Sequence, residues 1–452
     1  MSEIEIDTDN HPHFTQAVAK LGEHQAVVSH CAIFNDRGIK IVDKGVAINQ
    51  ALYSRLTQYK LSAPLENCVA PANALTGDSL RADAETILDT VPLFGRMAPD
   101  VKTRHLFLDA LQALPLPAPM ALQLTIARDV HPSIYHHLLR TALTAAFLSK
   151  TPVLSRFDVN VAVMAGMLHD IGMLHIDPRL MQPNRALNRD QRRQLYAHPL
   201  VSTALIERHH AYPKEVVRAV REHHEYLDGS GYPRQLSKDE ISPLSKILAI
   251  AQVVSAMFST DLPGAELRLS VLLRMNTHRF DATLAMQIID LLRPKDDLLV
   301  MEIHRDEQPL QLMQKINALL DQWPAEQLQL ESLTPTRQQQ LVKLGAQLAE
   351  IRRGLAKVGA APDQLAQLGG ALDDDILVEI SLVMREAAWQ LRTLARQTRS
   401  RWKLQENESY PPALARWITD MQALVRPIFG QTDDESPEYS APNMVAFNSE
   451  VA

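Results

Sequence analysis

Residues 223–233 have the sequence HHEYLDGSGYP. Two adjacent histidines open this stretch, and a turn-rich segment from Asp228 to Pro233 closes it with glycines that permit positive φ angles. Neighbouring residues on a helix point about 100° apart, so a histidine pair can face one ion when it sits at a helix end. The stretch therefore predicts a ligand-bearing helix end followed by a loop.

Histidine is concentrated in the same part of the chain, because ten of the 17 histidines lie within residues 131–224. Several of them are separated by about one helix plus one loop, which lets successive helices of a bundle each deliver a ligand. A second pair, His169-Asp170, follows an apolar segment and precedes Ile171-Gly172, a natural helix stop. The candidate metal ligands are His137, His169, Asp170, His198, His223 and His224.

Imidazole and carboxylate ligands together suit Fe, Mn, Ni or Zn, and no thiolate favours Zn specifically. Two such ions that share the Asp170 carboxylate would stabilise in-line displacement at phosphorus, which indicates phosphohydrolase chemistry. We interpret His175, His209 and His210 as structural residues instead, the last two because cationic side chains suit a helix C-terminus.

Three motifs in this region resemble the HD-GYP family, a branch of the HD phosphohydrolases. They are HDIG at 169–172, HP at 198–199 and the long stretch at 223–233, and the likeness covers roughly residues 125 to 300. The resemblance implies an all-α domain with a metal cluster that hydrolyses the bacterial second messenger cyclic di-GMP to a linear dinucleotide or to GMP.

The resemblance also implies roles for individual residues. Asp170 and His169 would be the catalytic residues, with Asp170 bridging the ions. One ion would be held by His137, His169, Asp170 and a later aspartate, and the other by Asp170, His198, His223 and His224. One wall of the substrate pocket would be formed by Asp228, Gly229, Gly231, Tyr232 and Pro233.

The chain departs from the family pattern at several positions. Met173 stands where the family has lysine, and Gln252 stands where it has the later aspartate. A neutral amide is a weaker ligand than a carboxylate, so the first ion loses a charged ligand while the second keeps its set. The family's Arg-Pro-Tyr-Arg element is replaced by residues 261–264, DLPG, which removes charge-assisted hydrogen bonds to phosphate. The glutamate linked to a third ion is also absent, so we expect one or two ions.

Composition limits the classes of partner. The 452 residues include 46 Lys+Arg and 53 Asp+Glu, a formal net charge of -7, which disfavours a DNA-binding protein. The acidic start MSEIEIDTDN does not resemble a signal peptide, and we expect a cytoplasmic protein without a membrane segment. Cys31 and Cys68 cannot form a disulfide framework, which favours a reducing compartment.

The pattern along the chain predicts four regions. Residues 1–118 form an N-terminal α/β unit with a hairpin that turns at Asn35 to Gly38, and connecting helices. Residues 119–305 form the HD-GYP-like domain, which follows the proline-rich segment at 115–119. Residues 306–430 form a C-terminal helical region, and residues 431–452 form a disordered tail.

Two apolar stripes predict an antiparallel helical hairpin in the C-terminal region. They run from Leu341 to Val358 and from Ile376 to Leu394, and a segment that contains Gly369-Gly370 joins them. We interpret the stripes as core packing in preference to a partner-binding surface.

We therefore expect a mainly α protein, with an all-α HD-type helical bundle, a small α/β N-terminal unit and a C-terminal helical hairpin. The function that the resemblance implies is metal-dependent hydrolysis of cyclic di-GMP in bacterial signalling. The alternative is a catalytically impaired module that binds nucleotide or recruits another signalling protein, such as a diguanylate cyclase. Hydrolysis of a related phosphoester and assembly into a homodimer also stay open.

Overall fold

The structure is a computed structural model that describes residues 12–150, 156–182, 187–258, 263–293, 309–323, 333–367, 373–402 and 411–429. The described residues fall into two compact units. Unit 1 contains those of Met1–Asp261 and Arg279–Gln287, and unit 2 contains those of Leu262–His278 and Ile288–Ser440. The predicted tail at 431–452 and the Gly369-Gly370 turn lie outside the described residues.

Unit 1 begins with the predicted small α/β part. Its elements are α1 (Pro12–His24), β1 (Val27–Ser29), β2 (Ile33–Phe34), β3 (Lys40–Val42), α2 (Gln50–Thr57), η1 (Leu65–Asn67) and β4 (Val69–Pro71). The predicted hairpin is present as β2 and β3, whose turn holds Gly38 at a φ of 74°. The segment that precedes β2 does not extend this hairpin, because β1 pairs antiparallel with β4.

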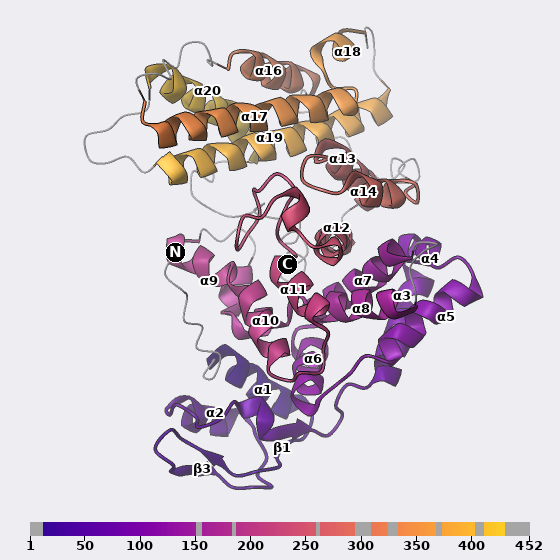
Figure 1. The fold of residues 1–452 in the computed structure, drawn as a ribbon, viewed down its shortest axis with the longest axis vertical. Coiled ribbons are helices and arrows are strands. Elements are labelled where there is room, and N and C mark those ends of the chain that lie inside the picture. The colour runs from indigo at the N-terminus through magenta and orange to yellow at the C-terminus, as the bar shows by residue number, and fades with distance from the viewer. Residues whose placement is uncertain are drawn as a thin grey trace. The chain divides into compact units, whose positions relative to one another are not determined.

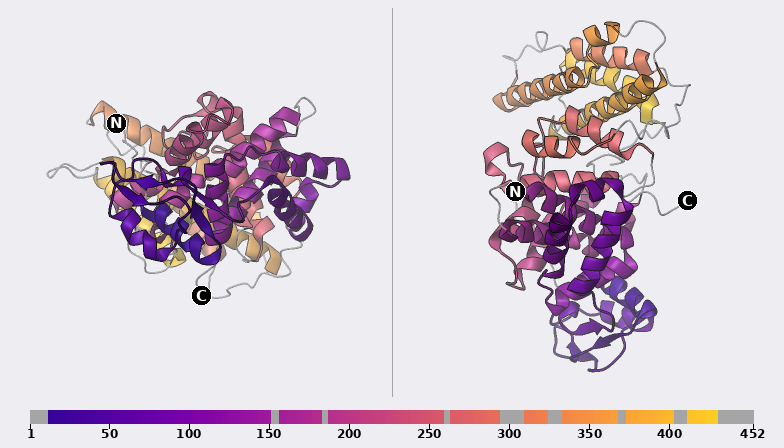
Figure 2. Two further views of the ribbon diagram at one scale, coloured as in Figure 1. Left: turned by 90° about the horizontal axis from the view of Figure 1, so that it is seen from below. Right: turned by 90° about the vertical axis from the view of Figure 1, so that its right-hand side faces the viewer.

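A helical bundle follows and contains the histidine-rich region (Figures 1 and 2). Its α-helices are α3 (Gly77–Thr90), α4 (Pro92–Met97), α5 (Val101–Gln112), α6 (Ala118–Val130), α7 (Pro132–Ser149), α8 (Arg156–Leu168), α9 (Arg189–Leu195), α10 (His198–Glu207), α11 (Lys214–Glu222) and α12 (Pro243–Met257). Short 3-10 helices are η2 (Ile171–His175), η3 (Pro178–Met181) and η4 (Lys238–Glu240). The predicted boundary at 118 coincides with the start of α6, inside unit 1.

Helix α7 lies at the centre of the bundle and packs against both α8 and α12. It is apolar around most of its circumference, which is typical of a fully buried helix. Close approach to α8 requires a glycine, since a Cβ at Gly166 would lie 2.5 Å from Cα of Ala142. This packing brings His137 of α7 next to the C-terminal end of α8.

Unit 2 contains the predicted C-terminal helices. Its helices are α13 (Ala265–Met275), α16 (Pro309–Asp321), α17 (Pro335–Lys357), α18 (Pro362–Gln367), α19 (Asp374–Trp402) and α20 (Pro412–Phe429), while α14 (Ala282–Ile289) begins in unit 1 and ends in unit 2. The two predicted stripes lie on α17 and α19, which contact each other and bury their apolar residues (Figure 1). The predicted hairpin is an incomplete description of this region. Helix α18 lies between α17 and α19 along the chain, and residues of α13, α16 and α20 belong to the same hydrophobic core.

The cysteines differ from the expectation drawn from the sequence. Cys31 and Cys68 are joined by a disulfide in the N-terminal part, with their Cα atoms 5.2 Å apart. The pairing of β1 with β4 brings these two segments together, which spacing along the chain does not reveal. None of the described helices is long and apolar enough to cross a membrane.

Candidate metal centre

Four helices deliver the six predicted ligands to one place in unit 1. His137 lies within α7, and His198 is the first residue of α10. The two predicted pairs lie at helix ends: His169-Asp170 follows α8, and His223-His224 follows α11. All six residues are buried, with exposed fractions between 0% and 4%. The predicted helix-end placement of both pairs is confirmed.

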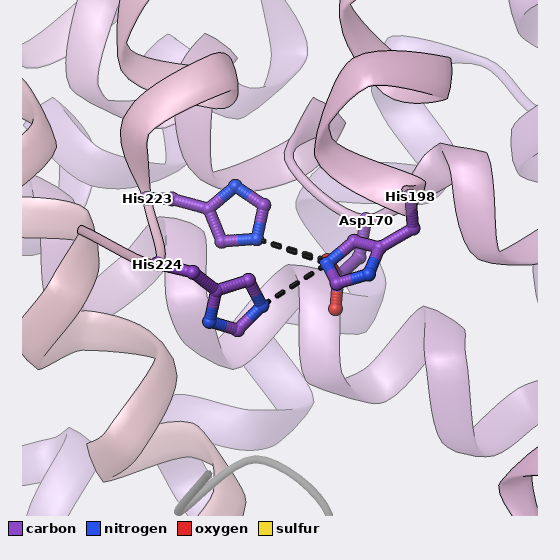
Figure 3. Close-up of side chains that lie close together, drawn as sticks. All are labelled: Asp170, His198, His223 and His224. Atoms are coloured by element: carbon purple, nitrogen blue, oxygen red, sulfur yellow. Dashed lines mark hydrogen bonds and ion pairs between the residues drawn. The ribbon is translucent and has the colours of Figure 1, made fainter. Parts of the chain in front are cut away.

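The six residues form two ligand sets that share Asp170. In each set the candidate ligand atoms lie within 4.8 Å of one another. The first set is His137, His169 and Asp170, and the second set is Asp170, His198, His223 and His224. Figure 3 shows the rings of His223 and His224 pointing toward His198, with the Asp170 carboxylate beside them.

Gly172 holds Asp170 against the start of α10. Its N–H donates to Oγ of Ser202 at 2.9 Å, and a Cβ at this position would lie 2.5 Å from the carbonyl oxygen of His198. Any larger residue would push η2 away from α10. The HDIG glycine therefore sets the distance between Asp170 and His198.

Backbone carbonyls fix the protonation of three rings. Nδ1 of His169, His198 and His223 donates to the carbonyl three residues earlier, at 2.8, 2.8 and 2.6 Å. A carbonyl oxygen only accepts, so in each neutral ring the proton is on Nδ1 and Nε2 carries a lone pair. All three Nε2 atoms face the cluster.

Ser255 fixes the fourth ring, that of His137. Its Oγ lies 2.9 Å from His137 Nδ1 and 3.0 Å from the His137 carbonyl oxygen. Because the hydroxyl must donate to the carbonyl, it accepts from Nδ1, which leaves Nε2 of His137 unprotonated. A residue of α12 therefore orients a ligand on α7.

Burial favours the neutral form of three rings in the cluster, those of His137, His223 and His224. It lowers the pKa of His137 to about 3 and that of His223 to about 4, and it holds the pKa of His224 well below the usual value. Burial alone would raise the pKa of Asp170, but the positive charge and hydrogen bonds that His169 and His198 supply when they are protonated outweigh it, so the carboxyl pKa lies well below the usual range.

The donor set fits a cation. Nε2 of His137 lies 3.2 Å from Nε2 of His169, and Nε2 of His198 lies 3.3 Å from Nε2 of His223, with lone pairs on both sides. Oδ1 of Asp170 lies 3.1 Å from His198 Nε2 and receives no hydrogen bond from the described residues. Converging buried acceptors without protons between them repel one another unless a positive ion lies between them.

Gln252 contacts the second ligand set, although the family resemblance assigned its position to the first. Its Nε2 donates to the carbonyl oxygen of His223 at 2.7 Å and lies 3.4 Å from Nδ1 of His224. The Gln252 side chain is completely buried. The amide is thus held by the backbone of the histidine pair.

The predicted loop residues lie against the same pair. The Tyr232 N–H donates to the His224 carbonyl at 3.1 Å, and the Tyr232 ring stacks on the His224 ring with centroids 4.5 Å apart. The Tyr196 ring stacks on the Tyr232 ring, with centroids 4.6 Å apart. Buried Glu225 accepts from the N–H groups of Arg234 and Leu236 and fastens the end of the loop.

The remaining sequence interpretations concern η2 and the other histidines. Met173 is 6% exposed and places an apolar side chain where the family has lysine. His175 stacks on Phe14 of α1 and lies 3.1 Å from Oε1 of Gln123, which agrees with its interpretation as a structural residue. His209 and His210 follow the end of α10, outside both ligand sets.

Sequence reasoning missed three residues that shape the centre: Ser255, Tyr196 and Glu225. Ser255 lies three positions after Gln252 and so on a neighbouring part of the same helix face, a signal that was available in the sequence. Tyr196 carried no such signal, because only the folded loop brings Tyr232 onto it.

Comparison with known proteins agrees with this geometry. A family model described as HD domain matches residues 121–284. A 3'3'-cGAMP-specific phosphodiesterase of Vibrio cholerae is 29% identical over 121 residues, which cover 27% of this chain and 26% of that protein. A cyclic di-GMP phosphodiesterase of Pseudomonas aeruginosa is 30% identical over 169 residues, covering 36% of this chain and 40% of that protein.

The solved structure of an HDG"Y"P protein from Bdellovibrio bacteriovorus aligns with this chain at a TM-score of 0.34 and 13% identity. The alignment covers 59% of this chain and 94% of that protein's chain. Residues 121–284 are thus similar to an HD domain. The names of the two curated relatives refer to hydrolysis of cyclic dinucleotides. The chain spans between about a quarter and two fifths of the length of the two curated relatives described above.

Proposed function

We propose that this chain binds one or two divalent transition-metal ions and hydrolyses a phosphodiester bond of cyclic di-GMP or a related cyclic dinucleotide. The observation that carries the proposal is the convergence of four unprotonated Nε2 atoms and the Asp170 carboxylate in a buried cluster. Fe, Mn, Ni and Zn suit these ligands. The substrate class comes from the names of the relatives.

In this proposal Asp170 would serve both ligand sets, His137 and His169 would complete the first, and His198, His223 and His224 would complete the second. Bound ions would supply positive charge that neutralises phosphoryl oxygens and favours ionisation of water. Arg140, one turn after His137, lies near enough for its charge to act on that ring. The loop residues Asp228, Gly229, Gly231, Tyr232 and Pro233 would form the pocket wall.

A second candidate function is a catalytically impaired module that binds a protein or nucleotide. Buried Met173 and the backbone-bound Gln252 favour it, because neither supplies charge to substrate or metal. Tyr232 packs against His224, so the exposed surface that the loop offers a signalling partner is that of Arg234 and Gln235.

The two functions are separated by metal analysis and a turnover assay on the same preparation. We expect the wild-type protein to contain metal and to convert cyclic di-GMP to the linear dinucleotide or GMP, and Asp170→Asn to lose both properties while its circular dichroism is unchanged. Cyclic GMP-AMP is the second substrate to test. If the metal-loaded protein leaves both dinucleotides intact, and a cellular phenotype depends on Arg234 and Gln235 but not on Asp170, the binding function is correct.

A further inference from the structure

The amide of Gln252 has a fixed orientation. Because the carbonyl oxygen of His223 only accepts hydrogen bonds, the atom 2.7 Å from it must be Nε2 and not Oε1. The amide therefore presents an N–H donor, not an acceptor, toward Nδ1 of His224 at 3.4 Å.

This orientation determines the tautomer of His224. An amide nitrogen carries two hydrogens, and with one on the His223 carbonyl the other faces Nδ1 of His224. Nδ1 must be unprotonated to accept it, so the proton of the neutral ring is on Nε2. There it can donate to the unprotonated Nε2 of His198, which lies 3.0 Å away.

Among the five histidines of the two ligand sets, His224 differs from the others. Nδ1 of His169, His198 and His223 faces a carbonyl, and Nδ1 of His137 faces the accepting Ser255 hydroxyl. Such acceptors favour the tautomer that ligates through Nε2. His224 has a donor in the equivalent place.

We propose that Gln252 is a positioning residue that holds His224 in the non-ligating tautomer and thereby lowers the metal affinity of the second set. Ligation by Nε2 of His224 requires its proton to move to Nδ1, where it opposes the Gln252 N–H. The inference rests on the proposed metal-dependent function and deepens it, since it assigns control of metal affinity to a position where the family resemblance expects a ligand.

The test is the affinity of the full chain for Zn²⁺, measured by competition with a chromophoric chelator. In Gln252→Glu a carboxylate accepts from Nδ1 of His224, and second-shell partners of this kind change metal affinity by about 10–100-fold, so we expect Zn²⁺ to bind at least about 10-fold more tightly. Gln123→Glu is the matched control, because it makes the same change beside His175, outside both sets. It should leave Zn²⁺ affinity unchanged.

Two further variants keep the test decisive. Gln252→Leu removes the opposing N–H without burying a charge, and it should also bind Zn²⁺ more tightly than the wild type. In a His224→Ala background the gain from Gln252→Glu should disappear, because the effect passes through that ring.

The results distinguish this inference from the proposed function. If neither Gln252 variant binds Zn²⁺ more tightly than the wild type, or if the gain persists without His224, the inference is wrong and the metal centre stands. If the wild type binds no divalent metal and hydrolyses no dinucleotide, the proposed function itself is wrong.

Discussion

At the scale of single residues, the two ligand sets are unequal. The second set offers four candidate ligands and the first offers three, and both depend on Asp170. We expect His223→Ala to abolish the tightly held ion, because it removes an imidazole whose Nδ1 proton is already placed for ligation. Elemental analysis after gel filtration without chelator measures the ion content.

His137→Ala is the matched change in the first set. It should leave the tightly held ion in place, since His137 does not belong to the second set. Full loss of metal in the His137 variant, with retention in the His223 variant, would reverse the assignment of the stronger set.

The ligands were predictable from the sequence because ligand chemistry resides in residue type and spacing. The residues that orient those ligands were harder to predict from the sequence. Ser255 orients His137 across 118 positions of sequence, and Gln252 reaches His223 across 29, through packing of α12 against α7 and α11. A motif identifies a ligand, whereas its orientation depends on which helices pack together.

At the scale of elements, the loop after α11 acts as a cover for the second ligand set. The stacked rings of Tyr196, Tyr232 and His224 join the end of α9, the loop and the histidine pair. We expect Tyr232→Ala to lower the free energy of unfolding by about 2–4 kcal/mol, as large-to-small substitutions of packed aromatic residues do. It should also speed the loss of metal to a chelator.

Tyr232→Phe separates the ring from the hydroxyl. The Phe ring preserves the stacking on His224, so thermal stability and the rate of metal loss should both stay near those of the wild type. If the Phe variant loses metal as fast as the Ala variant, the hydroxyl and not the stack retains the ion.

Among the secondary-structure elements too, some features follow from a local sequence pattern and others only from packing. Apolar periodicity predicted α17 and α19 because a helix with one buried face repeats its apolar residues every three or four positions. The pairing of β1 with β4 and the Cys31–Cys68 bond depend on contacts between distant segments. Strands this short have no repeating sequence pattern from which such pairings could be predicted.

At the scale of the whole molecule, the buried histidines link folding to pH. An unfolded histidine titrates near pH 6.5, whereas burial lowers the pKa of His137 to about 3 and that of His223 to about 4 in the folded chain. Between these values the unfolded state binds more protons than the folded state. The free energy of unfolding of the metal-free protein should therefore be constant above about pH 7 and fall below about 6.5, by up to about 1.4 kcal/mol per pH unit for each such histidine.

Urea unfolding of the chelator-treated protein between pH 7.5 and 5 measures this slope. The variant His137→Gln/His223→Gln removes two of the groups that take up protons on unfolding, so its unfolding free energy should depend less steeply on pH. Metal should steepen the dependence in the wild type, because protons compete with the ion for Nε2 once the chain opens. A free energy of unfolding that does not change between pH 7.5 and 5 without metal would mean that these rings are not held neutral by burial.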